Sequence, residues 1–209
     1  MFLDINKKRQ KCYNYNIRNY MQNIKNGNLK YKIILTERTS SMKKGITRRE
    51  LEITEQSQII EILDKCKVLH LAMVDGDKPY VIAMNYGYTM EGGKLTLYMH
   101  GATQGRKLDI LRANPKVCFE MDCDLVPFEG DVPCQYGIAY SSIIGTGKAE
   151  LVENPEDKMH ALSILMKTQT GKDFEFNERL VSIVSVIKIE VVEYAAKHRP
   201  VPPAHLKEN

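Results

Sequence analysis

The sequence lacks any long uninterrupted apolar run, and this absence excludes a transmembrane helix. Its first residues also lack the charged-then-apolar order of a secretory signal. With 209 residues, 43% apolar and 27% charged, the chain suits one globular domain with or without an arm. We therefore predict a cytoplasmic protein with no membrane partner.

Paired cysteine spacing is also missing. The five cysteines (Cys12, Cys66, Cys118, Cys123 and Cys134) contain no C-x-x-C pair, so we predict no metal site. An odd number without a secretion signal predicts reduced thiols. Cys66 and Cys118 lie in apolar runs, which predicts that both are small core residues.

Several catalytic and nucleotide-binding motifs are absent. No G-x-G-x-x-G follows a strand, and there is no G-x-S-x-G elbow, so neither a Rossmann site nor a serine hydrolase is supported. The segment 101–107 departs from the spacing of a phosphate-binding P-loop. Gly145–Lys148 lies inside a strand pattern with no helix after it.

The positive charge is concentrated at one end. Residues 1–50 hold 13 Lys/Arg and 3 Asp/Glu, whereas residues 51–209 hold 17 and 23. An acidic body repels phosphate, so we predict no nucleic-acid partner. We interpret residues 1–45 as a basic, poorly ordered extension, residues 46–200 as the folded domain and residues 201–209 as a tail. Two alternatives remain: a true start at Met42, or an arm that binds RNA or an acidic partner.

Hydrophobic alternation and turn signals predict six strands and three or four helices. The strands are expected at 68–74, 79–89, 94–100, 116–122, 136–151 and 185–194, and the helices at 56–67, 103–113, 155–170 and 177–182. A loop is expected at 124–135. Gly145 and Gly147 indicate a bend or a close backbone approach. Hairpin connections favour an α+β or mainly β fold over βαβ alternation.

The segment that joins the third strand to the second helix has the strongest chemical signal. Thr103, Arg106 and Lys107 are expected in the first turns of that helix, where cations oppose the helix dipole. A bound anion would account for the cations, and the free backbone N–H groups suit a phosphate monoester. The alternative is that both cations are solvated surface charges. His100, at the strand end, is either a functional or a structural histidine.

The run from His100 to Glu120 resembles the pyridoxamine 5′-phosphate oxidase-like FMN-binding split barrels, and is most similar to the nitroimidazole-resistance (Nim) type. Segments 78–86, 140–150 and 187–191, with Arg48–Glu50, extend the resemblance over roughly residues 46–200. The resemblance implies a six-stranded antiparallel split β-barrel with flanking helices. It also implies a homodimer that holds one FMN in each of two interface clefts.

The resemblance further implies roles for individual residues. Arg106 and Lys107 would bind the FMN phosphate, with Thr103 as hydroxyl donor. The isoalloxazine would lie against Val81, Ile82, Ala83 and Met84. Tyr98, Met99 and His100 would line the cofactor pocket, Ser141 and Ser142 would reach FMN from the second subunit, and His100 would be the catalytic residue.

The chain departs from true pyridoxamine 5′-phosphate oxidases at its end. The terminal motif of those enzymes contains Trp and Arg, whereas this chain has no Trp and continues from Arg199 through three prolines. We therefore expect an FMN-dependent reductase for a small nitroaromatic or quinone acceptor, with NAD(P)H or another reductant, rather than vitamin B6 oxidation. The alternatives are a non-catalytic flavin- or haem-binding protein, and a structural dimer with an RNA-binding arm.

Overall fold

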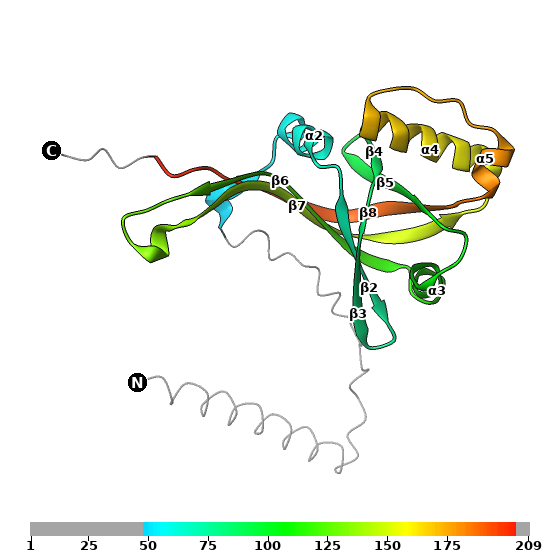
Figure 1. Ribbon diagram of the computed structural model, residues 1–209, viewed down its shortest axis with the longest axis horizontal. Helices are drawn as coiled ribbons and strands as arrows, with labels where there is room; N and C mark the ends of the chain where they lie inside the picture. The colour runs from blue at the N-terminus through cyan, green and yellow to red at the C-terminus, as the bar shows by residue number, and fades with distance from the viewer. Residues whose placement is uncertain (1–47, 204–209) are drawn as a thin grey trace, which may run out of the picture. The chain divides into compact units, whose positions relative to one another are not determined.

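The computed structural model describes residues 48–203 (Figure 1). The predicted extension, residues 1–45, lies outside the described residues, and so does most of the predicted tail, residues 204–209. Within the described range, no helix combines the length and the hydropathy needed to cross a membrane.

The described residues form one antiparallel sheet with helices packed against it (Figure 1). The elements are η1 (Arg49–Leu51), β1 (Glu52–Ile53), α2 (Gln56–Lys65), β2 (Leu69–Asp75), β3 (Lys78–Met84), β4 (Gly87–Glu91), β5 (Lys94–Gly101), α3 (Arg106–Ala113), β6 (Lys116–Phe128), η2 (Pro133–Gln135), β7 (Gly137–Val152), α4 (Pro155–Thr170), α5 (Glu178–Ser182) and β8 (Ser185–Arg199). The strand order is β3-β2-β6-β7-β8-β5-β4, and β1 pairs with β8. The predicted fold class is confirmed, with eight strands in place of six.

Two differences account for the larger strand count. The short strand β1 was not predicted, and the single strand expected at 79–89 divides at Asn85–Tyr86 into β3 and β4. Tyr86 is fully buried, and its hydroxyl donates to the Leu63 carbonyl of α2 at 2.7 Å. β3 and β4 lie at opposite ends of the strand order, so this buried tyrosine marks where the chain crosses between the two edges. The sheet therefore curls without closing.

Three boundaries differ from the prediction for identifiable reasons. β6 was expected to end at 122, but its pairing with β7 resumes at Val126 after a bulge in which Asp124 has a φ of 57°. β8 extends beyond 194 to Arg199 because β7 pairs with it over that length. The third difference is α3, which begins at Arg106 rather than Thr103, since Gly105 has a φ of 136° and is not helical.

Alternation along the strands gives the sheet a buried inner face. Phe119, Met121 and Ile143 are fully buried there and share a cluster with Ile62 and Leu63 of α2. Each buried aliphatic side chain contributes about 1.5–3 kcal/mol to folding. Cys66 is a core residue, as predicted. The prediction for Cys118 is wrong: it lies between two inward-facing residues of β6 and is only half-buried.

The glycines of β7 allow the strand to bend closely around this core. A methyl group at Gly145 would stand 2.5 Å from Cζ of Phe119 and 2.8 Å from the Glu193 carbonyl oxygen. Gly147 follows a register shift against β8. The predicted close backbone approach is confirmed at both positions.

A second, smaller cluster lies where α4 and α5 pack near β4, β5 and β8 (Figure 1). Asn154 caps α4, because its side-chain oxygen accepts hydrogen bonds from the backbone amides of Glu156 and Asp157 at 2.8 and 3.2 Å. Gly87 lets β4 approach the backbone of α4 at Leu165, where any larger residue would collide. This cluster supports the end of β5 that carries His100.

Candidate functional site

The sheet has an outer face that stays open to solvent in the described residues. We use "outer face" for the side chains that point away from the core on five strands: Val81, Ala83, His70, Ala72, Cys118, Glu120, Asp122, Tyr140, Ser142, Ile144, Ala195, Lys197 and Arg199. The strand register joins them, since Ala83 opposes His70, His70 opposes Glu120, and Glu120 opposes Ile144. Val81 is 56% exposed and Ile144 48%.

Strand alternation divides the predicted flavin-contacting residues of β3 between the two faces. Val81 and Ala83 are exposed on the outer face, whereas Ile82 is half-buried and Met84 is buried against the core. Only the backbone of the latter two can be near a molecule on the outer face. The alternation predicted from the sequence is confirmed.

Lys107 points back towards the end of β5. A methyl group at Gly101 would collide with the Lys107 Nζ, so glycine leaves the space that this ammonium group occupies. Among residues 48–203, no carboxylate lies within ion-pair distance of Lys107. No side chain caps α3, so its first backbone N–H groups lack a side-chain acceptor. Thr103 is exposed and precedes the helix.

Arg106 points elsewhere, although it is the next residue. Its Nη2 lies 2.8 Å from Oδ2 of Asp75, and its Nε donates to the same oxygen at 2.9 Å. The guanidinium also lies 4.6 Å from the ring centroid of Tyr80. The two cations expected to act together therefore differ, because within residues 48–203 Arg106 is paired with a carboxylate and Lys107 is not.

His100 is at the exposed end of β5, beside Lys107. Partial burial, and secondarily the positive charge of Lys107, lower the pKa of the imidazole below its ordinary value of about 6.5. The neutral form is therefore favoured at neutral pH. Met99, in contrast, is fully buried in the core, and Tyr98 packs against the second cluster. Of the three predicted pocket residues, Met99 faces away from the other two.

The two predicted serines also face opposite sides of the sheet. Ser142 is on the outer face but is itself only 6% exposed, and it lines two adjoining clefts of about 270 and 590 Å³. Both clefts include Tyr140, Lys197 and Arg199. These cations were not predicted as site residues, because the expected strand ended at 194; the alternation of Lys197 and Arg199 around 198 was the available signal.

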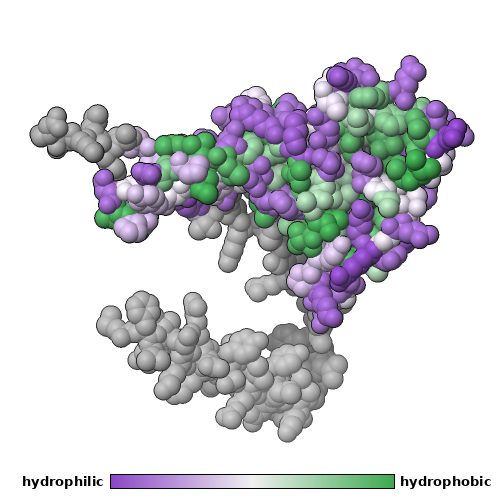
Figure 2. All heavy atoms as spheres, in the orientation of Figure 1, coloured by the Kyte–Doolittle hydropathy of each residue, from purple (hydrophilic) through white to green (hydrophobic). Residues whose placement is uncertain are grey.

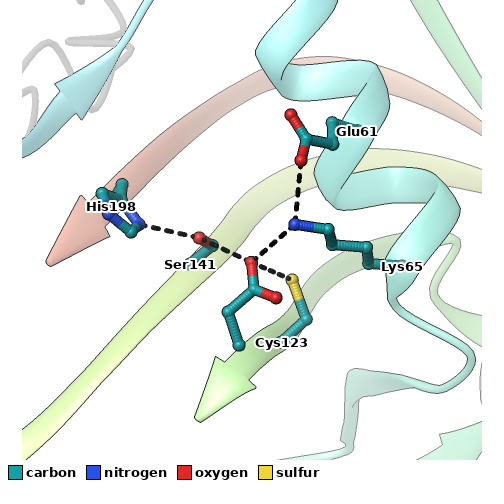
Figure 3. Close-up of polar contacts among 6 residues, drawn as sticks. Glu61, Lys65, Cys123, Ser141 and His198 are labelled. Atoms are coloured by element: carbon teal, nitrogen blue, oxygen red, sulfur yellow. Dashed lines mark hydrogen bonds and ion pairs between the residues drawn. The ribbon is translucent and has the colours of Figure 1, made fainter. Parts of the chain in front are cut away.

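Ser141 belongs to a polar network on the opposite side (Figure 3). Its Oγ lies 2.9 Å from Nδ1 of His198 and 3.4 Å from the Asp124 carboxylate. Lys65 of α2 contacts Asp124 at 3.1 Å and Glu61 at 2.8 Å. The hydrogen bond from Lys65 is the main cause of the lowered pKa of Asp124. The carboxylate meets the serine rather than the imidazole, which differs from the order of a catalytic triad. We interpret the network as a link between α2 and the β6 bulge.

Comparison with known proteins gives a consistent family and fold. Residues 55–198 match the family model described as pyridoxamine 5′-phosphate oxidase. A search of curated proteins finds no match.

Solved structures give further matches. A candidate 5-nitroimidazole antibiotic resistance protein from Bacteroides thetaiotaomicron is 29% identical with a TM-score of 0.62, covering 71% of this chain and 86% of that one. The flavocytochrome Anf3 from Azotobacter vinelandii is 18% identical with a TM-score of 0.62, covering 74% and 72%. A FAD- and haem-binding protein from Mycobacterium smegmatis is 15% identical with a TM-score of 0.61, covering 71% and 73%. At these lower identities, the last two show a shared fold.

Proposed function

The chain belongs to the pyridoxamine 5′-phosphate oxidase family, and from this premise we propose that it is an FMN-binding oxidoreductase. Its acceptor would be a small nitroaromatic or quinone-type molecule, and NAD(P)H or another reductant would supply electrons. The 29% identity to a candidate 5-nitroimidazole resistance protein supports this class of acceptor. We keep a cytoplasmic location as a prediction that rests on the free thiols.

The observation that carries this proposal is the position of Lys107. Its ammonium group lies over Gly101, at the uncapped start of α3. A cation without a carboxylate partner in the described part of the chain, next to backbone N–H groups that no side chain caps there, suits a dianionic phosphate monoester. Val81 and Ala83 of β3 expose apolar side chains, and such side chains suit a planar ring system. The residues present therefore fit FMN, which supplies the electron-transfer chemistry when bound.

Arg106 has a different part in this proposal. Two of its nitrogens contact Asp75, and its guanidinium rests on Tyr80, so its position is fixed by the β2–β3 hairpin. A guanidinium has five N–H donors, so Arg106 keeps donors available for an anion. Part of its charge is nevertheless balanced by Asp75. We therefore assign the larger share of phosphate binding to Lys107.

His100 would orient the acceptor or exchange a proton with it. The charge of Lys107 contributes to the lowered pKa of His100. A phosphate bound at Lys107 would offset that charge and raise the pKa of the imidazole towards its ordinary value. Cofactor binding would then make His100 a better proton acceptor than it is in the flavin-free protein, while burial continues to lower its pKa.

A homodimer would complete the site. Apolar side chains remain exposed on the outer face. They are also exposed on the long β6–β7 hairpin, where Figure 2 shows hydrophobic patches among polar residues. Leu125 is 60% exposed and Ile138 45%. Large exposed apolar patches mark interaction surfaces. A second copy would cover them, bring Ser142 to the flavin of the partner and exclude water. Ile138→Asp should therefore shift the protein from dimer to monomer in analytical ultracentrifugation, while the exposed-position control Glu150→Gln leaves it dimeric.

Two experiments test the function itself. The purified full chain should be yellow and release FMN on denaturation, and an Arg106→Ala/Lys107→Ala double variant should lose the flavin. Under anaerobic conditions, NAD(P)H should bleach the flavin and a nitroimidazole should restore its absorption rapidly. A double variant that retains FMN as tightly as wild type would refute the phosphate assignment.

A second candidate function is binding without turnover, with a flavin or haem as ligand. It is favoured by His100, which has no carboxylate partner among residues 48–203 to form an acid–base pair. Flavin that is reduced but not reoxidised by any acceptor would support this reading. A Soret band after reconstitution with haem would replace the flavin assignment.

A further inference from the structure

We propose that His70, Glu120 and Asp122 form a binding site for a first-row divalent transition metal ion on the outer face. The three side chains come from two neighbouring strands, β2 and β6. No flavin contact is assigned to any of the three, and His70 is the cross-strand partner of Ala83, on which the flavin ring is proposed to lie. The metal site therefore goes beyond the flavin proposal and would lie beside the flavin. The set contains no cysteine, so the spacing of the cysteines in the sequence gives no indication of it.

The strand register brings the three ligands together. His70 is the direct cross-strand partner of Glu120, and Asp122 follows Glu120 by two residues on the same face of β6. Nδ1 of His70 lies 3.4 Å from Oε2 of Glu120. One ligand atom from each residue lies within 4.8 Å of the other two. Ligand atoms around one such ion are about 3 Å apart, because each bond is about 2.0–2.2 Å long. Small side-chain rotations on a rigid sheet are therefore sufficient.

The charge around the cluster favours a cation. In the described range, His70 is the basic group in contact with Glu120, and Asp122 takes part in no ion pair. Lys197 lies in the same cross-strand row as Asp122, since both oppose Ser142 in the register. Its Nζ instead lies 5.0 Å from the ring centroid of Tyr140. Two carboxylates thus share one surface with an imidazole whose side chain is 50% exposed.

The ligand types indicate which ions would bind. An imidazole nitrogen with two carboxylates suits Mn²⁺, Fe²⁺, Co²⁺ or Zn²⁺, whereas Mg²⁺ and Ca²⁺ prefer oxygen ligands alone. Three ligands from one side leave coordination positions open. Glu120 and Asp122 also line the cleft of about 590 Å³ whose other residues include Ser142 and Lys197. Water, or an anionic ligand that also contacts Lys197, could occupy those positions.

Mn²⁺ is the probe that tests this site best, because manganese prefers oxygen and nitrogen ligands to the free thiols of this chain. The full chain, untagged, reduced and treated with chelator, is titrated with Mn²⁺, and the free ion is measured from its EPR signal. We expect one saturable site per chain. His70→Ala and Asp122→Asn should each weaken Mn²⁺ binding by at least about tenfold. His160→Ala and Glu150→Gln, exposed residues outside the cluster, should leave binding unchanged.

Three results would overturn the proposal. One is the absence of saturable Mn²⁺ binding by wild type; another is unchanged affinity in His70→Ala and Asp122→Asn that fold normally by circular dichroism. The third is Mg²⁺ displacing Mn²⁺ at equal concentration, which would contradict a transition-metal site. Lys107→Ala separates the two proposals, because it should lose FMN affinity and keep the Mn²⁺ site. Asp122→Asn should lose affinity for Mn²⁺ and keep its affinity for FMN.

Discussion

The inner and outer faces of the sheet are built from the same strands but carry different properties. On β6, Phe119 and Met121 are fully buried. The residues that alternate with them, Glu120 and Asp122, face outward. On β7, Ile143 is fully buried and its neighbour Ile144 is 48% exposed. The inner row holds the fold together. The outer row is available for ligands, so the effect of a substitution depends on the face to which the residue belongs.

The neighbouring isoleucines of β7 give the most direct test of this difference, and the largest expected effect. Ile143→Ala should lower the free energy of unfolding by about 2–5 kcal/mol, because it leaves a cavity in the core. Ile144→Ala should change it by less than about 1 kcal/mol. Urea unfolding of flavin-free protein measures both. Equal losses in the two variants would contradict the assignment of faces.

Gly101→Ala tests whether the end of β5 serves binding rather than stability. The added methyl group would displace the Lys107 ammonium and meet no other group that the structure places nearby. We expect the FMN dissociation constant to rise about tenfold, since a charge-assisted hydrogen bond contributes about 1.5–3 kcal/mol. The midpoint of urea unfolding should change little. In a Lys107→Ala background the same substitution should have almost no further effect on FMN binding; additive losses would show that Gly101 acts by another route.

The pKa of His100 should report the charge of Lys107. In Lys107→Ala, one of the two causes that lower this pKa is removed, so it should move up towards about 6.5. Burial is the larger cause, and it remains, so recovery should be incomplete. NMR titration of the imidazole resonances measures the shift, with Lys158→Ala as the control. A fall in the pKa would be inconsistent with the location of Lys107.

The network on the inner side of the β6 bulge should have the smallest effect. The pKa of Asp124 is lowered in the folded protein, mainly by Lys65, so ionised Asp124 stabilises the fold above its unfolded pKa of about 4. That contribution should disappear as the pH falls through the lower, folded value. Asp124 is exposed, so the contribution is small. Asp124→Asn should flatten the acid limb of stability against pH slightly, as measured by thermal unfolding from pH 5 to about pH 2.

Local patterns predicted the faces of the strands but not their long-range partners. Alternation placed Val81 and Ala83 opposite Ile82 and Met84, and the asparagine cap of α4 was visible in the sequence. The division of the expected strand 79–89 at Tyr86 was not visible in the sequence. It depends on a hydrogen bond from Tyr86 to Leu63 of α2, 23 residues away in the chain.

For the candidate site, too, local signals were visible in the sequence, and contacts between distant segments were not. Residues 98–108 were enough to predict a phosphate-binding segment, since all the signals for it lie close together in the sequence. The pairing of Arg106 with Asp75, 31 residues away, was not predicted. Arg106 and Lys107 were therefore expected to act alike. The His70–Glu120 contact likewise arises only when β2 and β6 pair. Contacts between distant segments have no signature in a single sequence.

The central claim is that Lys107, at the start of α3, anchors the phosphate of a flavin. FMN and riboflavin titrations of flavin-free wild type, Lys107→Ala and the α4 lysine control Lys158→Ala test it most directly. We predict that Lys107→Ala weakens FMN binding by about 10–150-fold, which corresponds to about 1.5–3 kcal/mol. Riboflavin, which lacks the phosphate, should bind wild type and Lys107→Ala equally. If FMN binds all three proteins with the same affinity, Lys107 does not hold the phosphate and the account is contradicted.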